Sequence, residues 1–259
     1  MAVLAAAVLG ALTTVHDVSR LAAILAAVSF GLAFAAEMYL WRTRPDRAWY
    51  DGRAGAESAK TLTWRFVVGG RPFEKNERSD AATEKLFLDR LHEVIGALKS
   101  VPLVAPAPLA AQITDRMREL RSRPLNERKQ VYLEWRIGDQ QGWYAAKASA
   151  NEKQGNRWTL LLAGLEGSAL LAAILMAVGA FRLDFLGIAA TGIGVAVAWM
   201  QAKQYQALAS AYAVACQELA EIKSRGASVK KEEDWAEFAD QSEEAISREH
   251  TLWRASRGA

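Results

Sequence analysis

The sequence predicts an all-α integral membrane protein with two transmembrane helical hairpins, each continued by long stalk helices and amphipathic helices outside the membrane. Two observations predict this fold class. Apolar residues, 51% of the chain, are concentrated in a few long stretches, whereas the segment between them is dense in charge. Outside those stretches, apolar side chains recur every three or four residues, the spacing that places them on one face of a helix. Segregation of this kind is typical of a membrane protein with extramembrane helices.

The first hairpin is predicted from two apolar stretches near the N-terminus. Residues 21–41 form a run of 21 residues with a single charge, Glu37. At about 1.5 Å per residue, such a helix is roughly 31 Å long and matches the apolar core of a bilayer. Residues 1–15 are apolar but short. A signal peptide would carry positive charge before its apolar run, whereas the first basic residue here is Arg20. We therefore interpret residues 1–15 as a short first span.

The second hairpin is predicted in the second half of the chain. Residues 158–181 carry one charge, Glu166, and residues 183–200 carry one charge, Asp184. Both runs are long enough to cross a bilayer as helices. The chain is therefore expected to cross the membrane four times.

The distribution of basic residues predicts the topology. Residues 42–157 hold 22 of the 32 Lys and Arg residues, residues from 201 onward hold 8, and each hairpin turn holds one. Basic residues next to spans favour the cytosolic side. The middle segment and the C-terminus are therefore expected in the cytosol, and both hairpin turns outside.

The extramembrane helices divide between two predicted units. The first unit, residues 1–124, has helices within 46–121, including one over 80–99. The second unit, 125–259, begins with a stalk over 126–157 that runs into the third span and has Asn126 as its N-cap. A second stalk follows the fourth span from residue 201 to Gly226, and an amphipathic helix covers 232–254.

Polar and aromatic side chains share faces of these helices. The candidate residues are Trp49, Arg53, Glu57, Lys60 and Trp64 on the first face, Arg136, Gln140, Trp143 and Lys147 on the second, and Glu249 and Trp253 near the C-terminus. Glu249 lies in an apolar stripe and needs a cationic partner, which either of the first two faces could supply. These faces fit seams between helices, in which buried charges fix the register, better than they fit a ligand pocket.

Four polar residues within the spans are candidates for a membrane function. An ionisable group inside a span indicates a functional site by default. Glu166 lies beside Ser168 and two glycines, so its helix face either packs closely or lines a water-filled path, and both interpretations stay open. Glu37 is close enough to the interface to reach water. Thr191 belongs to a stripe of small residues suited to close helix packing.

Catalysis and cofactor binding have no support in the sequence. The chain has three His residues, far apart, and one cysteine, Cys216, with apolar neighbours. No Cys, His or acidic cluster has metal-ligand spacing. No glycine-rich loop has the strand and Lys-Ser/Thr context of a phosphate loop. We therefore expect no enzyme activity, no cofactor and no nucleic-acid partner.

The three polar-aromatic segments resemble the SLATT superfamily of bacterial two-span proteins, in the order expected for a tandem fusion of two units. The segments that carry the resemblance are Trp49-Tyr50-x-x-Arg53-Ala54-x-Ala56-Glu57-Ser58-x-Lys60-Thr61-x-x-Trp64-Arg65-Phe66, Tyr132-x-x-x-Arg136-Ile137-x-Asp139-Gln140-x-x-Trp143-Tyr144-x-x-Lys147-Ala148, and Glu244-Ala245-Ile246-Ser247-Arg248-Glu249-His250-Thr251-x-Trp253.

The resemblance implies a membrane effector of bacterial conflict systems, such as antiphage defence, located in the inner membrane. Such an effector forms a pore or perturbs the bilayer as a homo-oligomer, and a nucleotide-signal sensor or synthase encoded nearby is its expected partner. The alternative is a membrane-anchored scaffold or ligand-sensing adaptor without conduction, in which the spans serve only as an anchor.

Overall fold

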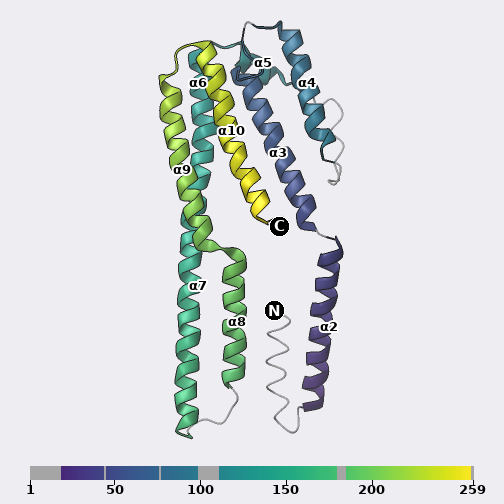
Figure 1. The fold of residues 1–259 in the computed structure, drawn as a ribbon, viewed down its shortest axis with the longest axis vertical. Helices are drawn as coiled ribbons and strands as arrows, with labels where there is room; N and C mark the ends of the chain where they lie inside the picture. Colours follow the sequence, from purple (N-terminus) through teal and green to yellow (C-terminus); the bar gives the residue numbers. More distant parts are fainter. Residues whose placement is uncertain (1–18, 44, 76, 99–110, 180–184, 258–259) are drawn as a thin grey trace. The chain divides into compact units, whose positions relative to one another are not determined.

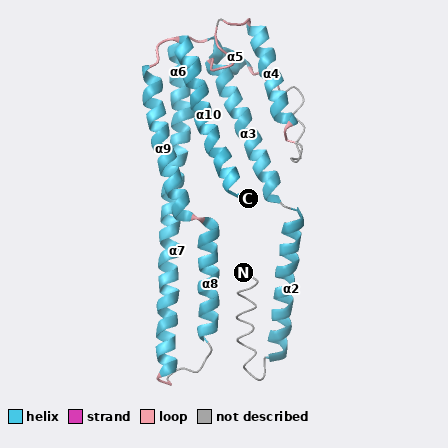
Figure 2. Ribbon diagram, viewed as in Figure 1, coloured by secondary structure: helices cyan, strands magenta, loops and turns pink. Residues whose placement is uncertain are grey.

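The computed structural model describes residues 19–43, 45–75, 77–98, 111–179 and 185–257. Within these ranges the chain is helical almost throughout and contains no strand (Figures 1 and 2). The predicted all-α fold is therefore confirmed. The predicted span over residues 1–15 lies outside the described residues.

The chain forms two compact units, each assembled from both halves of the sequence. The span unit comprises Met1–Thr43 and Ala145–Val214, and the polar unit comprises Arg44–Tyr144 and Ala215–Ala259. The predicted division at residue 124 follows the order of the chain, whereas the compact units do not. Each half of the sequence therefore contributes helices to both units.

The span unit contains the apolar helices. They are α2 (Ser19–Thr43), most of α7 (Asp139–Ala177), α8 (Phe185–Lys203) and the first part of α9 (Tyr205–Ser228). The described chain has three helices long and apolar enough to cross a membrane: Ala23–Thr43, Leu125–Ala177 through its apolar part from Trp158 onward, and Leu186–Ser228. Helices able to cross a membrane are therefore found at the predicted second, third and fourth spans.

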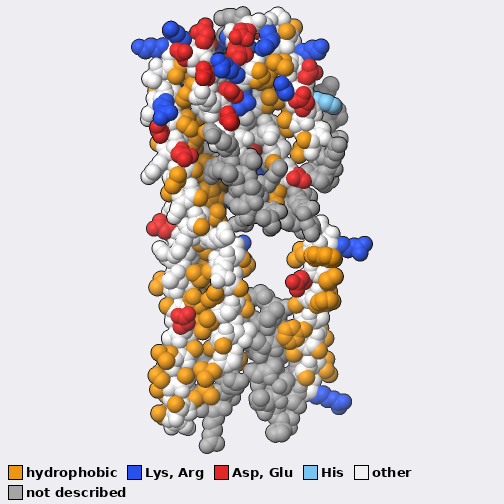
Figure 3. Space-filling view, in the orientation of Figure 1, with side chains coloured by type: hydrophobic (Ala, Val, Ile, Leu, Met, Phe, Trp, Pro, Cys, Tyr) orange, Lys and Arg blue, Asp and Glu red, His pale blue; other side chains and the backbone are white. Residues whose placement is uncertain are grey.

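Most apolar side chains of these helices face outward. Phe34 is 67% exposed and Leu160 is 74% exposed. In Figure 3, orange side chains cover α2, α7 and α8, whereas charged side chains gather on the helices of the polar unit. Exposed apolar surface on this scale is suited to lipid rather than to water.

The fourth span is interrupted before it continues as a stalk. α8 ends at Lys203 and α9 begins at Tyr205, because Gln204 adopts a left-handed backbone conformation with φ of 50°. Trp199 packs against Trp158 of α7, with ring centroids 6.2 Å apart, and Lys203 Nζ lies 4.7 Å from the Trp199 ring. The predicted passage from the fourth span into the stalk is therefore broken at one residue, and the stalk is α9.

The polar unit is built mainly from α3 (Pro45–Val68), α4 (Asp80–Gly96), α5 (Asp115–Ser122), α6 (Leu125–Tyr132) and α10 (Glu232–Arg257). Between α6 and α7 the chain makes one π-helical turn, η1 (Leu133–Gly138), so the helix beginning at Leu125 runs on into the third span.

Three predicted helix ends are wrong. Asn126 is the second residue of α6 rather than its N-cap, because Pro124 occupies the cap position and α6 begins at Leu125. α4 ends at Gly96 and not at Lys99. Gly226 lies within α9, which continues to Ser228. A Cβ at position 226 would lie 2.7 Å from Phe238 Cζ, so this glycine permits close helix packing and does not end the helix.

The core of the polar unit is aromatic. Phe66, Phe73 and Phe87 are almost fully buried, and the ring centroids of Phe66 and Phe87 are 4.7 Å apart. On the other side of α3, Tyr132 packs edge-on against Trp235 at 5.6 Å. Burial of each large side chain contributes about 1.5–3 kcal/mol, so these rings fix the positions of α3, α6 and α10.

Candidate functional site

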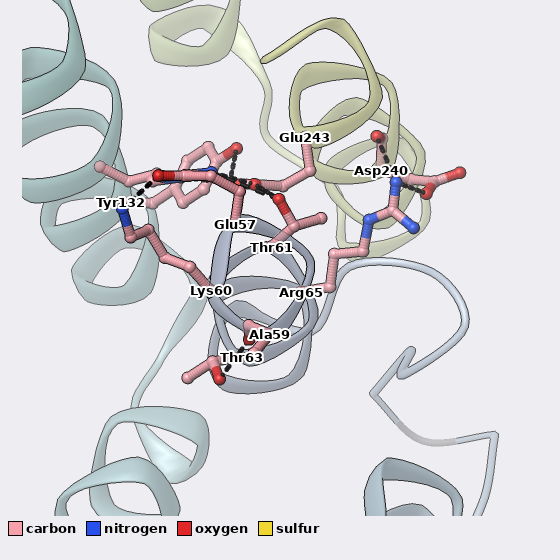
Figure 4. Close-up of polar contacts among 10 residues, drawn as sticks. Glu57, Ala59, Lys60, Thr61, Thr63, Arg65, Tyr132, Asp240 and Glu243 are labelled. Carbon is pink, nitrogen blue, oxygen red and sulfur yellow. Dashed lines mark hydrogen bonds and ion pairs between the residues drawn. The ribbon is translucent and has the colours of Figure 1, made fainter. Parts of the chain in front are cut away.

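A buried ionic cluster joins three helices at the centre of the polar unit. Its carboxylate is Glu243 of α10, which is fully buried. Arg136 of η1, 3% exposed, donates to both Glu243 oxygens, from Nη2 at 2.7 Å and from Nε at 2.9 Å. Tyr132 of α6 and Thr61 of α3 donate their hydroxyls to the same carboxylate at 3.0 and 2.8 Å (Figure 4). We call these four residues the Glu243 cluster.

Local structure explains how each side chain reaches the cluster. Trp235, Ala239, Glu243 and Ile246 recur at intervals of four, four and three residues along α10, so they share its buried face. On the facing helix, the π-helical turn places Leu133, Arg136 and Ile137 inward and leaves Trp135 59% exposed. A π-helical turn shifts the register of a helix and is frequent at functional sites.

The electrostatics of the Glu243 cluster are those of a tight buried pair. Burial lowers the pKa of Arg136, but its hydrogen bonds to Glu243 and the charge of that carboxylate outweigh burial, and the net pKa is raised. Burial and the charge of Glu243 hold the pKa of Tyr132 well above its ordinary value. Tyr132 therefore stays protonated as a donor, and Arg136 stays charged.

A second ion pair, between Arg65 and Asp240, lies at the edge of the same interface. Arg65 Nη2 is 2.9 Å from an Asp240 carboxylate oxygen and 3.2 Å from the Asp240 carbonyl oxygen (Figure 4). Both side chains are partly exposed, at 22% and 32%. Solvent screening makes this pair weaker than the Glu243 cluster although the distances are similar.

Two further buried arginines hold the end of α3. Arg121 donates to the carbonyl oxygens of Phe66 and Phe73 at 2.7 and 2.9 Å. Arg128 donates to the carbonyl oxygen of Val68 and to the carboxylate of Glu232. The last carbonyls of a helix lack partners within it and carry partial negative charge, so guanidinium groups stabilise them. Sequence reasoning missed both arginines, because neither belongs to a helical pattern that predicts burial.

The predicted polar-aromatic residues are spread over several places. Trp64 packs on Tyr132, with centroids 5.8 Å apart, beside Arg136. Arg53 lies over Trp49 and Trp143, at 5.6 and 6.0 Å from their ring centroids.

Lys60 pairs with Glu57 at 3.0 Å, so this contact stays within α3. Gln140 is half-buried on α7, and Lys147 is exposed where α7 belongs to the span unit. Glu249 and Trp253 are part of α10, but their side chains lie outside what is described. The carboxylate that meets Arg136 is Glu243, which sequence reasoning missed.

Each polar residue predicted within the spans is either exposed or hydrogen-bonded within its own helix. Glu37 on α2 and Glu166 on α7 are both exposed. Ser168 donates its hydroxyl to the Leu165 carbonyl oxygen at 2.8 Å, and Thr191 donates to the Gly187 carbonyl oxygen at 2.8 Å. Each hydroxyl is thus satisfied within its own helix, a common arrangement for Ser and Thr in spans. The described residues include no group of three His, Cys, Asp or Glu side chains that could hold a metal ion.

Comparison with known protein families gives two matches in tandem. Residues 1–129 match the model described as SMODS and SLOG-associating 2TM effector domain 3 (SLATT_3). Residues 132–253 match SMODS and SLOG-associating 2TM effector domain 1 (SLATT_1). No curated protein and no solved structure matches the chain.

Proposed function

The chain belongs to the SLATT family as a tandem of two two-span effector domains, and we propose that it perturbs the membrane or conducts ions as a homo-oligomer. The observation that carries this proposal is the pair of effector-domain matches over chain segments that contain helices able to cross a membrane. The protein is a membrane protein, and the remaining question is what its spans do there.

The exposed span surfaces support assembly. The apolar stretch of α2 has none of its residues buried, and that of the third span has 6% buried. These faces are open to lipid or to helices of other copies. Four spans are too few to enclose a wide aqueous path, so a path would form between subunits. Glu166 is the residue that we assign to such a path, because a carboxylate in a span is costly unless water or a partner meets it.

The setting follows from charge and from the family description. We propose the bacterial inner membrane, with the middle segment and the C-terminus in the cytosol, because basic residues follow the second span and precede the third. The proposed partner is a nucleotide-signal synthase or sensor, as the words "SMODS and SLOG-associating" suggest. The function needs no catalysis, cofactor or nucleic acid.

Ion flux tests the proposal. Overexpression in bacterial cells raises the concentration of subunits and favours assembly by mass action, even without the natural trigger. We expect wild-type protein to collapse the membrane potential in these cells and to release ions from densely reconstituted liposomes. Glu166→Gln should lower the flux several-fold without changing the oligomer. Glu152→Gln, the same change on exposed α7 surface ahead of the apolar run, is the matched control. Intact potential and tight liposomes with the wild-type protein would contradict the proposal.

A non-conducting adaptor is the second candidate. The observation that favours it is exposed apolar surface on the polar unit, where Trp135 is 59% exposed, Leu88 42% and Ile95 41%. Exposed tryptophan is a common anchor in protein interfaces. An adaptor predicts that Glu166→Gln has no effect and that Trp135→Ala abolishes function in cells while membrane insertion is retained.

A further inference from the structure

A cleft in the polar unit lies between the start of α4, helix α5 and the loop that follows α3. Its volume is about 320 Å³. Charged side chains dominate its lining: Lys75, Asp80, Glu84, Arg118, Glu119 and Arg121. Cavities of this size accommodate small ligands, so the question is which charge the cleft leaves unbalanced.

Half of the charged lining residues already have an ionic partner. Arg118 donates to both oxygens of Glu84, at 2.7 and 3.1 Å. Glu119 accepts from Arg123 at 2.5 Å. Among the lining residues, these pairs leave the cations Lys75 and Arg121 against the single carboxylate Asp80. The carboxylates of Glu74 and Glu232 act on these cations from outside the lining.

Arg121 is the strongest sign of a missing partner. It is only 6% exposed, and its Nη atoms donate solely to backbone carbonyl oxygens, those of Phe66, Phe73 and Glu74. Its Nε is buried and has no acceptor. No carboxylate of the described chain lies within 4.0 Å of its guanidinium. A buried cation without an anionic partner is costly, and an unmade hydrogen bond adds about 1–3 kcal/mol.

Lys75 stands in the same positive field. Burial lowers the pKa of Lys75, and the charges of Arg121 and Arg128 lower it further, while the carboxylates of Asp80 and Glu232 oppose the shift. The backbone N–H groups at the start of α4 add partial positive charge beside Asp80, since Ser79 caps this 17-residue helix. An anion in the cleft would therefore meet an ammonium group and a guanidinium group close to the start of a helix.

We propose that this cleft binds the phosphate group of a small soluble ligand, with Lys75 and Arg121 as its cationic contacts. A compact anion with several acceptor oxygens can serve both cations, because charge-assisted hydrogen bonds to phosphate are strong. Asp80 opposes binding, since its carboxylate occupies the same field. This site is independent of the membrane activity proposed above, because it involves no residue of the spans.

Inorganic phosphate is the probe that tests the site. Full-length protein in phosphatidylcholine nanodiscs is titrated with phosphate at constant ionic strength, and its melting temperature is followed by tryptophan fluorescence. Phosphate stabilises proteins in general, so the comparison among variants decides. Wild-type protein should show saturable stabilisation. Lys75→Gln should weaken the apparent affinity roughly tenfold, as expected for one charge-assisted contact. Asp80→Asn should strengthen it, because the opposing charge is removed.

Lys85→Gln is the matched control, since Lys85 is exposed on α4 and does not line the cleft. It should bind phosphate as the wild type does. Equal stabilisation of the wild-type and Lys75→Gln proteins, or none in either, would overturn the proposal. A second series in nanodiscs with phosphatidic acid identifies the source of the phosphate. A soluble ligand predicts the same titration in both lipids. If phosphatidic acid alone stabilises the protein and removes the response to phosphate, the soluble source is refuted.

Discussion

Neutralising Glu243 should destabilise the polar unit far more than neutralising Asp240, although each carboxylate lies within 3 Å of an arginine. In Glu243→Gln, the amide oxygen can accept one bond from Arg136, but its NH2 group faces the guanidinium. Arg136 then remains charged and 3% exposed without its ion-pair partner. Breaking a buried pair in this way costs about 3–5 kcal/mol.

Asp240→Asn removes a pair whose partners are 22% and 32% exposed. Screened pairs of this kind contribute about 0–1 kcal/mol. The bond from Arg65 to the Asp240 backbone carbonyl is kept in the variant. The two substitutions therefore differ in the burial of the pair and much less in its distance, which makes Asp240→Asn the matched control.

Thermal unfolding of the full chain in detergent, followed by tryptophan fluorescence, measures both variants. For a unit of this size, 1 kcal/mol shifts the melting temperature by about 2–4 °C. We expect Glu243→Gln to lower the melting temperature of the polar unit by roughly 10 °C. The expected change for Asp240→Asn is at most about 4 °C. Arg136→Met combined with Glu243→Gln should cost less than the sum of the single changes, because no unpaired charge remains. Equal small shifts for the two single variants would refute the argument from burial.

Three further predictions follow from the same unit. The pKa of Tyr132 is raised in the folded state. Its contribution to stability is therefore fully present below about pH 10 and is lost as pH rises through the folded-state pKa. The stability of Tyr132→Phe in alkaline solution should consequently depend less on pH than that of the wild type. Gly69→Ala should destabilise the polar unit by more than about 1 kcal/mol in thermal unfolding, because φ is 77° and a Cβ would lie 2.9 Å from Arg128 Nη1. Gly96→Ala is the control, since a Cβ at that position would meet no atom within 4 Å. Residues 1–129 and 132–253 should be soluble in detergent and protease-resistant only when co-expressed, because the Glu243 cluster contains residues of both; protection of either half alone would contradict this.

The sequence predicted the helices well and their partners less well. Apolar runs and the 3.6-residue period depend only on neighbours along the chain, so the spans and amphipathic faces could be read directly. Glu243 also carried a signal, because it lies eight residues after Trp235 on the buried face of α10. To choose Glu243 over Glu249 as the partner of Arg136, one must know which turn of α10 packs against η1. That position depends on contacts between segments that are distant in the sequence.

The buried arginines show a different limit. Arg121 and Arg128 lie among many basic residues and resemble ordinary surface charges in the sequence. Their partners are mainly backbone carbonyl oxygens, two of them at the end of α3, and a carbonyl has no side-chain signature. The π-helical turn that brings Arg136 inward has no sequence pattern either. These features could be found only once α3 and α6 were placed side by side.

The Glu243 cluster also limits how the two tandem domains can act. Thr61 comes from the first domain, and Tyr132, Arg136 and Glu243 come from the second. α3 follows the second span, and η1 leads through α7 into the third, so the chain connects both spans directly to this cluster. Separating α10 from α3 and η1 would remove the carboxylate partner of Arg136, at a cost of about 3–5 kcal/mol. If activation requires that separation, a trigger must bind the opened form roughly 10² to 4 × 10³ times more tightly than the closed form. A weaker Glu243 pair would lower this threshold, so Glu243→Gln is expected to increase membrane activity in the absence of any trigger, provided that the protein still inserts.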